Sequence, residues 1–182
     1  MDILKNRYNI FCILIVVMKS MCSCNSQDEQ IKQFISTPIN LQVNKMIFVG
    51  EDSNWLDKTN YIHVLYFDSL RCSSCLSNKL VRLHEFENKA KEIDSLYNIC
   101  IVVSGNRSTI KYLKRVKYYS KYLPITYVDT ADVFSKNNPM FIKSSLYESF
   151  MIDKQGNVKV LGNPISNAKI GDLLLSVLKE HK

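Results

Sequence analysis

The chain of 182 residues predicts an α/β fold, with a central mixed sheet, flanking helices and a C-terminal β-hairpin. Two apolar strand patterns, at 61–67 and 98–104, are each followed by a helical pattern, and this order requires parallel strands with right-handed crossovers. Near the C-terminus, the polar turn DKQGN at 153–157 separates two short apolar runs and predicts an antiparallel hairpin. We therefore expect one domain over residues 45–182.

The strand patterns differ in strength. YIHVLYF at 61–67 is an almost continuous run of aromatic and β-branched residues, which is typical of a strand covered on both faces. Gly156 suits the position of the hairpin turn that needs a positive φ. The expected strands are 45–50, 61–67, 98–104, 124–130, 147–152 and 158–162.

Apolar residues at steps of three and four predict three helices and their buried faces. They cover about 72–93, 106–122 and 166–181, with a short helical turn at 131–139, and Asn106 or Ser108 is expected to cap the second helix. The buried positions expected for the three helices are Leu76, Leu80, Leu83, Phe86, Ala90 and Ile93, then Tyr112, Leu113, Val116, Tyr119 and Leu123, then Ile170, Leu173, Leu174, Val177 and Leu178.

The N-terminus has the layout of a secretory signal over residues 1–23. Basic residues precede the apolar stretch 10–18, which is too short for the roughly 20 residues of a spanning helix. MCSC at 21–24 resembles a bacterial lipobox, and this resemblance implies lipidation of Cys24; a plain cleaved signal is the alternative. Residues 24–44 would then be a tether. We expect a lipid-anchored protein of the bacterial cell envelope that faces the periplasm.

Charge predicts no strong partner. The formal net charge is +7, and its densest patch, KYLKRVKYYSKY at 111–122, interleaves basic residues with tyrosines. Such a stripe can bind nucleic acid or acidic lipid headgroups. On a helix it can equally be a solvated face beside a buried one, and we interpret it so; no nucleic-acid partner is expected.

Cys72 and Cys75 lie where the strand 61–67 gives way to a helix. In the first helical turn, their Cα atoms would be about 5 to 5.5 Å apart, within reach of a disulfide. The free N–H groups of the helix start lower the pKa of the Cys72 thiol, and Arg71 adds positive potential. Cys75 is expected to be more sheltered. Cys72 would attack a substrate and Cys75 would resolve the mixed disulfide.

Other chemistry has weaker signals. Asp68 is near enough in sequence to accept a proton from Cys75, although a turn residue is an equal interpretation. A metal site would need more ligands than one CxxC supplies. We expect Cys100 to be a buried small hydrophobe, His63 a hydrogen-bonded core residue and His84 a solvent-edge residue, with His181 at the tail. Glu85 and Glu87 are expected on a charged helix face. No metal and no organic cofactor are predicted.

The order strand, CxxC helix, strand, helix, strand, hairpin and helix resembles the thioredoxin fold, and more narrowly the exported, membrane-tethered TlpA-like thioredoxins. YFDSLRCSSC matches their active-site strand and turn, and FMIDKQGNVKVLGNP is similar to their hairpin. The chain departs from the family pattern at Arg71 and Ser73-Ser74, where an aromatic residue and a Gly-Pro-like pair are usual. The resemblance places Tyr147 at the substrate-facing position that a cis-proline occupies in the family.

The resemblance and the cysteine pair together predict a thiol-disulfide oxidoreductase that acts through Cys72 and Cys75. Its expected partners are protein or small thiol and disulfide substrates, an upstream dithiol electron donor, and the membrane through the lipid anchor. The alternative is a redox-inactive binding module of the same fold, in which the pair forms a structural disulfide. A bridge that closes so short a loop contributes little stability, which favours the redox interpretation.

Overall fold

The computed structural model describes residues 28–50, 55–68, 73–139 and 147–180, with backbone only at 73–78. It divides into two compact units, residues 1–36 and 37–182. In the first unit, residues 28–36 are helical. Within the described ranges, no helix is both long and apolar enough to cross a membrane. The predicted signal at 1–23 and Cys24 lie outside the described residues.

The second unit begins at Thr37, earlier than the boundary at residue 45 that the sequence predicts. Ile39 and Leu41 are buried, and the Ile39 amide donates a hydrogen bond to the Gly156 carbonyl at 2.8 Å. These contacts make residues 37–44 part of the folded unit, so the prediction of a free tether is wrong for this stretch. Gly156 has φ 84°, as the hairpin turn requires.

Six strands form one mixed sheet in the order β1-β4-β3-β2-β5-β6. β2, β3 and β4 are parallel, whereas β1 runs antiparallel to β4, and β5 runs antiparallel to β2 and β6. This topology confirms the predicted mixed sheet with its C-terminal hairpin. The strands are β1 Ile47–Phe48, β2 Tyr61–Phe67, β3 Tyr97–Ser104, β4 Ile125–Asp129, β5 Ser149–Asp153 and β6 Val158–Leu161.

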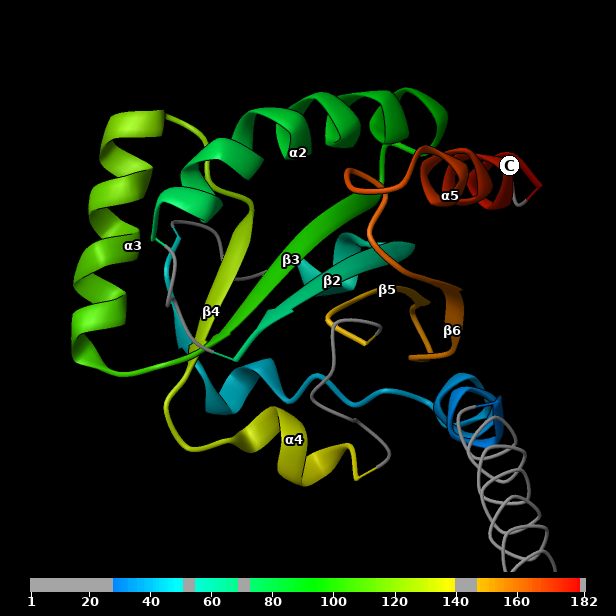
Figure 1. Ribbon diagram of the computed structural model, residues 1–182, viewed down its shortest axis with the longest axis horizontal. Helices are drawn as coiled ribbons and strands as arrows, with labels where there is room; N and C mark the ends of the chain where they lie inside the picture. Colours follow the sequence, from blue (N-terminus) through cyan, green and yellow to red (C-terminus); the bar gives the residue numbers. More distant parts are fainter. Residues whose placement is uncertain (1–27, 51–54, 69–72, 140–146, 181–182) are drawn as a thin grey trace, which may run out of the picture. The chain divides into compact units, whose positions relative to one another are not determined.

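Helices cover both faces of the sheet (Figure 1). α2, α3 and α5 lie on one face, and the short α4 lies on the other. Two single-turn 3-10 helices, η1 (Val43–Lys45) and η2 (Leu56–Lys58), flank β1 in sequence. The α-helices are α2 Ser73–Ile93, α3 Arg107–Ser120, α4 Val133–Asn137 and α5 Ala168–Glu180.

β2 is buried on both sides, as its sequence predicts. Tyr61 and Leu65 belong to the main core cluster, which α2, α3 and α5 complete. Tyr66 points to the opposite face and stacks on Phe134 of α4, with ring centroids 5.3 Å apart. This double cover holds the strand that leads into the cysteine pair rigidly in the centre of the sheet.

Among the helix positions whose side chains are described, the predicted faces are confirmed except at two; Leu76 lies outside this set. Asn106 caps α3 through a capping box, and Leu113 and Val116 are buried. Tyr119, however, is 75% exposed, because it lies about 120° around the helix from Leu113. Leu173 of α5 is 52% exposed beside the buried Leu174, from which it is rotated by about 100°. Both were wrongly predicted to face inward.

Glu87 also differs from its prediction as part of a charged, solvated helix face. Glu87 is only 7% exposed. The carboxylate accepts a hydrogen bond from the Tyr122 hydroxyl at 2.6 Å and pairs with Lys91 at 2.9 Å. These two partners satisfy a carboxylate that α2 carries toward α3, and the pairing comes from tertiary packing rather than from helix periodicity.

Candidate functional site: the junction of β2 and α2

The junction between β2 and α2 carries the cysteine pair. β2 ends at Phe67, Asp68 follows as an exposed residue, and α2 begins at Ser73. Cys75 is the third residue of α2, and only its backbone is described. Cys72, Arg71 and the rest of 69–72 lie outside the described residues. The prediction that strand gives way to helix at the cysteines is confirmed to within one residue.

The start of α2 is the electrostatic feature of this junction. The first backbone N–H groups of a helix have no carbonyl partner within the helix, and the helix dipole places partial positive charge there. An anion next to this end is favoured by up to about 2 kcal/mol, which corresponds to more than a tenfold change in acid dissociation. A thiolate carried by the residue just before Ser73 would have this benefit.

Lys79 brings a further cation to the junction. Its Nζ lies 5.8 Å from the centroid of the Phe67 ring, at the last residue of β2. The aromatic face holds the ammonium group near the strand end by a cation–π interaction. The sequence pattern places Lys79 on a helix surface but carries no signal for this contact, because the partner belongs to another element. Asp68 contributes a negative charge on the exposed side of the junction.

Tyr147 lies beside the same junction. β5 pairs with β2 in a register that matches Leu65 with Ser149, and the Tyr66 amide donates to the Glu148 carbonyl at 2.7 Å. Continuing this register by one pair brings Tyr147 opposite Phe67. Tyr147 is only 3% exposed. A substrate at this position would therefore meet the backbone of Tyr147 rather than its phenol ring, and the substrate-facing role remains a prediction.

The other potential ligands and nucleophiles do not join the junction. Cys100 is a free thiol, fully buried in β3, and burial raises its pKa strongly. His63 is fully buried and hydrogen-bonded to Ser149 at 2.8 Å, whereas His84 is exposed. These findings confirm the three predictions. His181 lies outside the described residues. Among the residues that the structure describes, no three of His, Cys, Asp or Glu come together.

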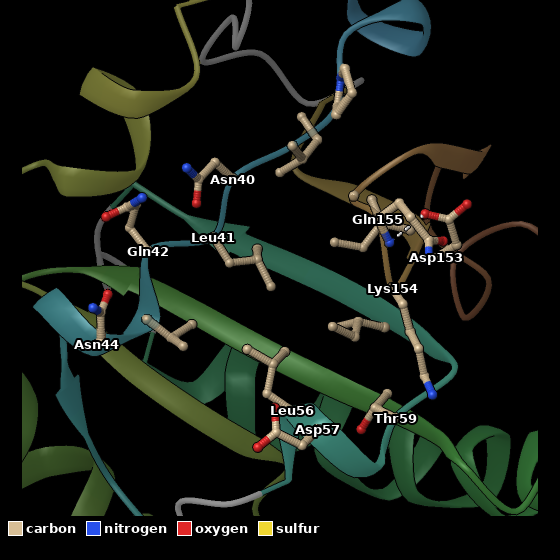
Figure 2. A pocket seen from close by; sticks show the side chains of 16 residues that line it. Asn40, Leu41, Gln42, Asn44, Leu56, Asp57, Thr59, Asp153, Lys154 and Gln155 are labelled. Carbon is tan, nitrogen blue, oxygen red and sulfur yellow. Dashed lines mark hydrogen bonds between the residues drawn. The ribbon is translucent and has the colours of Figure 1, made fainter.

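A cavity of about 850 Å³ lies at the other end of β2 (Figure 2). Residues 38–44, η2 and the β5–β6 turn surround it. Its lining combines side-chain amides and carboxylates with apolar residues that include Ile62 and Ile152. Sequence reasoning missed this cavity because it treated 38–44 as tether. Its walls contain no residue of the β2–α2 junction, so it takes no part in the chemistry considered for the cysteines.

Comparison of the sequence with protein-family models and with curated proteins gives no match. The structure, however, is similar to that of the thioredoxin domain of a thiol-disulfide oxidoreductase from Bacteroides vulgatus, with 16% identity, a TM-score of 0.51 and coverage of 75% of this chain and 90% of that chain. A thiol:disulfide interchange protein from Bacteroides sp. matches with 16% identity, a TM-score of 0.52 and coverage of 80% and 86%. ScoI from Arabidopsis thaliana, solved with copper bound, matches with 13% identity, a TM-score of 0.52 and coverage of 81% and 98%. The chain thus has a thioredoxin-like fold.

Proposed function

We propose that the chain is a thiol-disulfide oxidoreductase in which Cys72 is the nucleophile and Cys75 the resolving thiol. One observation carries the proposal. The sequence CSSC spans the start of α2, in the connection that follows the parallel strand β2, in a fold that thiol-disulfide oxidoreductases also adopt. No bound organic cofactor is needed, because the two thiols themselves carry the electron pair.

The exchange has two steps. The Cys72 thiolate attacks one sulfur of a substrate disulfide, forming a mixed disulfide and releasing the other sulfur as a thiolate. The Cys75 thiolate then attacks Cys72 sulfur, forming the Cys72–Cys75 disulfide and releasing the second substrate thiolate. The substrate gains two electrons and the protein loses two. A partner dithiol must return them in the reverse sequence for another turnover.

The junction supports this division of roles. The N-terminus of α2 favours negative charge on the residue before Ser73. Lys79 adds a cation near the end of β2 in space, and Arg71 adds one next to Cys72 in the sequence. Cys75 is one turn further along the helix, where the dipole has less effect. Asp68 is the carboxylate that we assign as proton acceptor for Cys75, because it follows β2 at the exposed side of the junction.

We also propose that the protein is exported and held to the bacterial envelope membrane by lipid on Cys24. The apolar stretch 10–18 and the MCSC sequence support this. Replacing Cys24 with Ser is expected to move the protein from the membrane fraction to the soluble periplasmic fraction, because the acyl chains supply the anchor. Fractionation with immunodetection measures this. Cys22→Ser serves as the matched control and should stay in the membrane fraction; equal release of both variants would contradict lipidation at Cys24.

The redox couple itself is the direct test of the proposed activity. Titration in glutathione buffers, with thiols counted by alkylation and mass spectrometry, is expected to give a reversible Cys72–Cys75 couple between about −120 and −270 mV, where working oxidoreductases lie. A bridge that resists reduction below about −300 mV would instead indicate the structural disulfide of a binding module. Elemental analysis of the same sample would show whether the two thiols hold a metal.

A further inference from the structure

One surface of the molecule has a concentration of charge that thiol exchange does not explain. The segment from Arg107 to Lys121 contains six basic residues and no acidic residue. It therefore carries +6 of the formal net charge of +7, and all other residues together sum to +1. This segment is α3 with its C-terminal cap, so nearly the whole net charge of the protein is concentrated on one helix.

Arg107, Lys111, Lys114 and Arg115 lie on the side of α3 that faces away from the core, whereas Lys117 is half-buried. Leu113 and Val116 pack inward. Lys111, Lys114 and Arg115 are exposed, and they make no ion pair within the described part of the chain. We call the exposed set the α3 basic face: Arg107, Lys111, Lys114, Arg115, Tyr118 and Tyr119.

Residues three and four apart lie next to one another on a helix, so Arg107, Lys111 and Lys114 form a continuous row that leads to Tyr118. In Figure 1, α3 lies at the flank of the helical layer, and no other labelled element covers its outer side. With respect to the described residues, the face is therefore an exposed, strongly cationic surface that spans about 20 Å along the helix.

Two tyrosines complete the C-terminal end of the face. Tyr118 is 76% exposed and Tyr119 is 75% exposed, and their rings meet edge to face with centroids 5.2 Å apart. Two adjacent exposed aromatic rings gain no burial from the fold. A phenol has an apolar body and a polar tip, which suits the headgroup layer of a bilayer, where tyrosine is enriched.

We propose that the α3 basic face docks on a membrane surface that contains anionic phospholipid. Lysine and arginine would contact lipid phosphates, and the two phenol rings would enter the headgroup layer. The charge of the face is complementary to such a surface, and basic residues held there strengthen binding about fivefold each. The outer face of a helix is convex and carries its charges along its length. It can therefore contact a flat layer of headgroups, and binding needs no groove.

Nucleic acid fits the observations less well. Single strands are bound in grooves that follow the backbone, with bases stacked on aromatic rings along the path. Here the two rings lie together at one end of the row of cations, and the cavity beside residues 38–44 and the smaller one beside Lys154 and Lys159 are lined by residues of other elements. The proposal depends neither on thiol exchange nor on lipid at Cys24. Its test therefore measures vesicle binding alone and uses a chain that lacks Cys24.

Sedimentation with vesicles tests the proposal. The chain starting at residue 25, which keeps every described residue, is used so that no acyl anchor contributes. It is expected to bind vesicles that contain phosphatidylglycerol and to remain free with phosphatidylcholine alone. Raising salt from about 0.1 M to about 1 M shortens the screening length from about 10 Å to about 3 Å and should release it.

Charge variants identify the surface responsible. Lys111→Gln with Lys114→Gln and Arg115→Gln should weaken binding about 100-fold, from about fivefold for each residue. The matched control replaces the exposed Lys58, Lys169 and Lys179 with Gln, which removes the same charge from other elements and should change binding less than tenfold. Tyr118→Ser with Tyr119→Ser should weaken binding without changing its salt dependence.

Three outcomes would overturn the proposal. They are equal binding to both vesicle types, equal weakening by the control triple variant, and tighter binding of a single-stranded oligonucleotide than of anionic vesicles. Circular dichroism confirms that each variant is folded, and the Tyr118 and Tyr119 variant keeps all six cations if the triple variant does not fold. A normal Cys72–Cys75 couple with no vesicle binding would reject this docking and leave the proposed thiol chemistry intact.

Discussion

Replacement of Cys72 with Ser is expected to reduce thiol-disulfide exchange to the uncatalysed background, a loss of about 1000-fold or more. The reason is that serine retains the shape of the residue before α2 but supplies no thiolate, and the hydroxyl is a far weaker nucleophile at neutral pH. Reduction of a disulfide-containing peptide by dithiothreitol, with and without the protein, measures this loss.

The companion variant separates the two cysteine roles. With Cys75→Ser, the first step still proceeds but the mixed disulfide has no resolving thiol, so Cys72 should stay bound to its substrate. Mass spectrometry of the trapped species should find many more adducts with Cys75→Ser than with Cys72→Ser. Cys100→Ala is the control and should leave activity unchanged, because Cys100 is fully buried and burial raises the pKa of its thiol. Equal trapping by the two variants would contradict the assignment.

The elements around this junction were predictable because each has a local signal. β2 was predicted at its observed bounds, and α2 begins within one residue of the predicted start. The run 61–67 is apolar except at His63 because both faces of β2 are covered, and the helical period starts where only one side of the element is buried. Gly156 signalled the hairpin turn through the one backbone conformation that other residues adopt only with strain.

The misplaced features depend on contacts between distant segments. Glu87 has the sequence context of a surface carboxylate, and its burial is compensated by the ion pair with Lys91 and by a hydrogen bond from Tyr122, which follows α3. Residues 37–44 look like a polar tether, yet the Ile39 amide pairs with the hairpin turn. Tyr119 follows Val116 by a step of three and is therefore predicted to be buried, but it is 75% exposed. Periodicity describes one element at a time and carries no information on these pairings.

His63 is the second residue for which a large effect is expected, and its hydrogen bonds determine its tautomer. The Ser149 hydroxyl donates to the Gly162 carbonyl at 3.0 Å, so the 2.8 Å contact with His63 requires a proton on Nε2. Nδ1 is buried and has no partner among the described residues. Its neighbours in register on β3 and β5 are the apolar Ile99 and Met151. A second proton would have no acceptor, and burial lowers the pKa of His63 to about 3.

This arrangement makes folding stability depend on pH. In the unfolded chain His63 has a pKa near its ordinary value of about 6.5, whereas in the folded chain its pKa is about 3. Between these two pH values the unfolded state binds a proton on His63 and the folded state does not. The contribution of His63 is fully present above about pH 6.5 and is lost as pH falls from there toward 3. Between pH 7 and pH 4.5, the free energy of unfolding should fall by about 2.5 kcal/mol from this residue alone.

Urea unfolding of the wild type and of His63→Gln at both pH values measures the effect as a difference of differences, since carboxylates contribute equally to both proteins. The variant should lose stability at pH 7 yet show a pH dependence that is smaller by about 2.5 kcal/mol. His84→Gln, which removes an exposed histidine, should keep the wild-type dependence. If His63→Gln does not fold, the ring proton signals of His63 in the wild type give the answer by NMR. A His63 signal that titrates near pH 6.5 would show that the buried ring accepts a proton, and would refute the assignment.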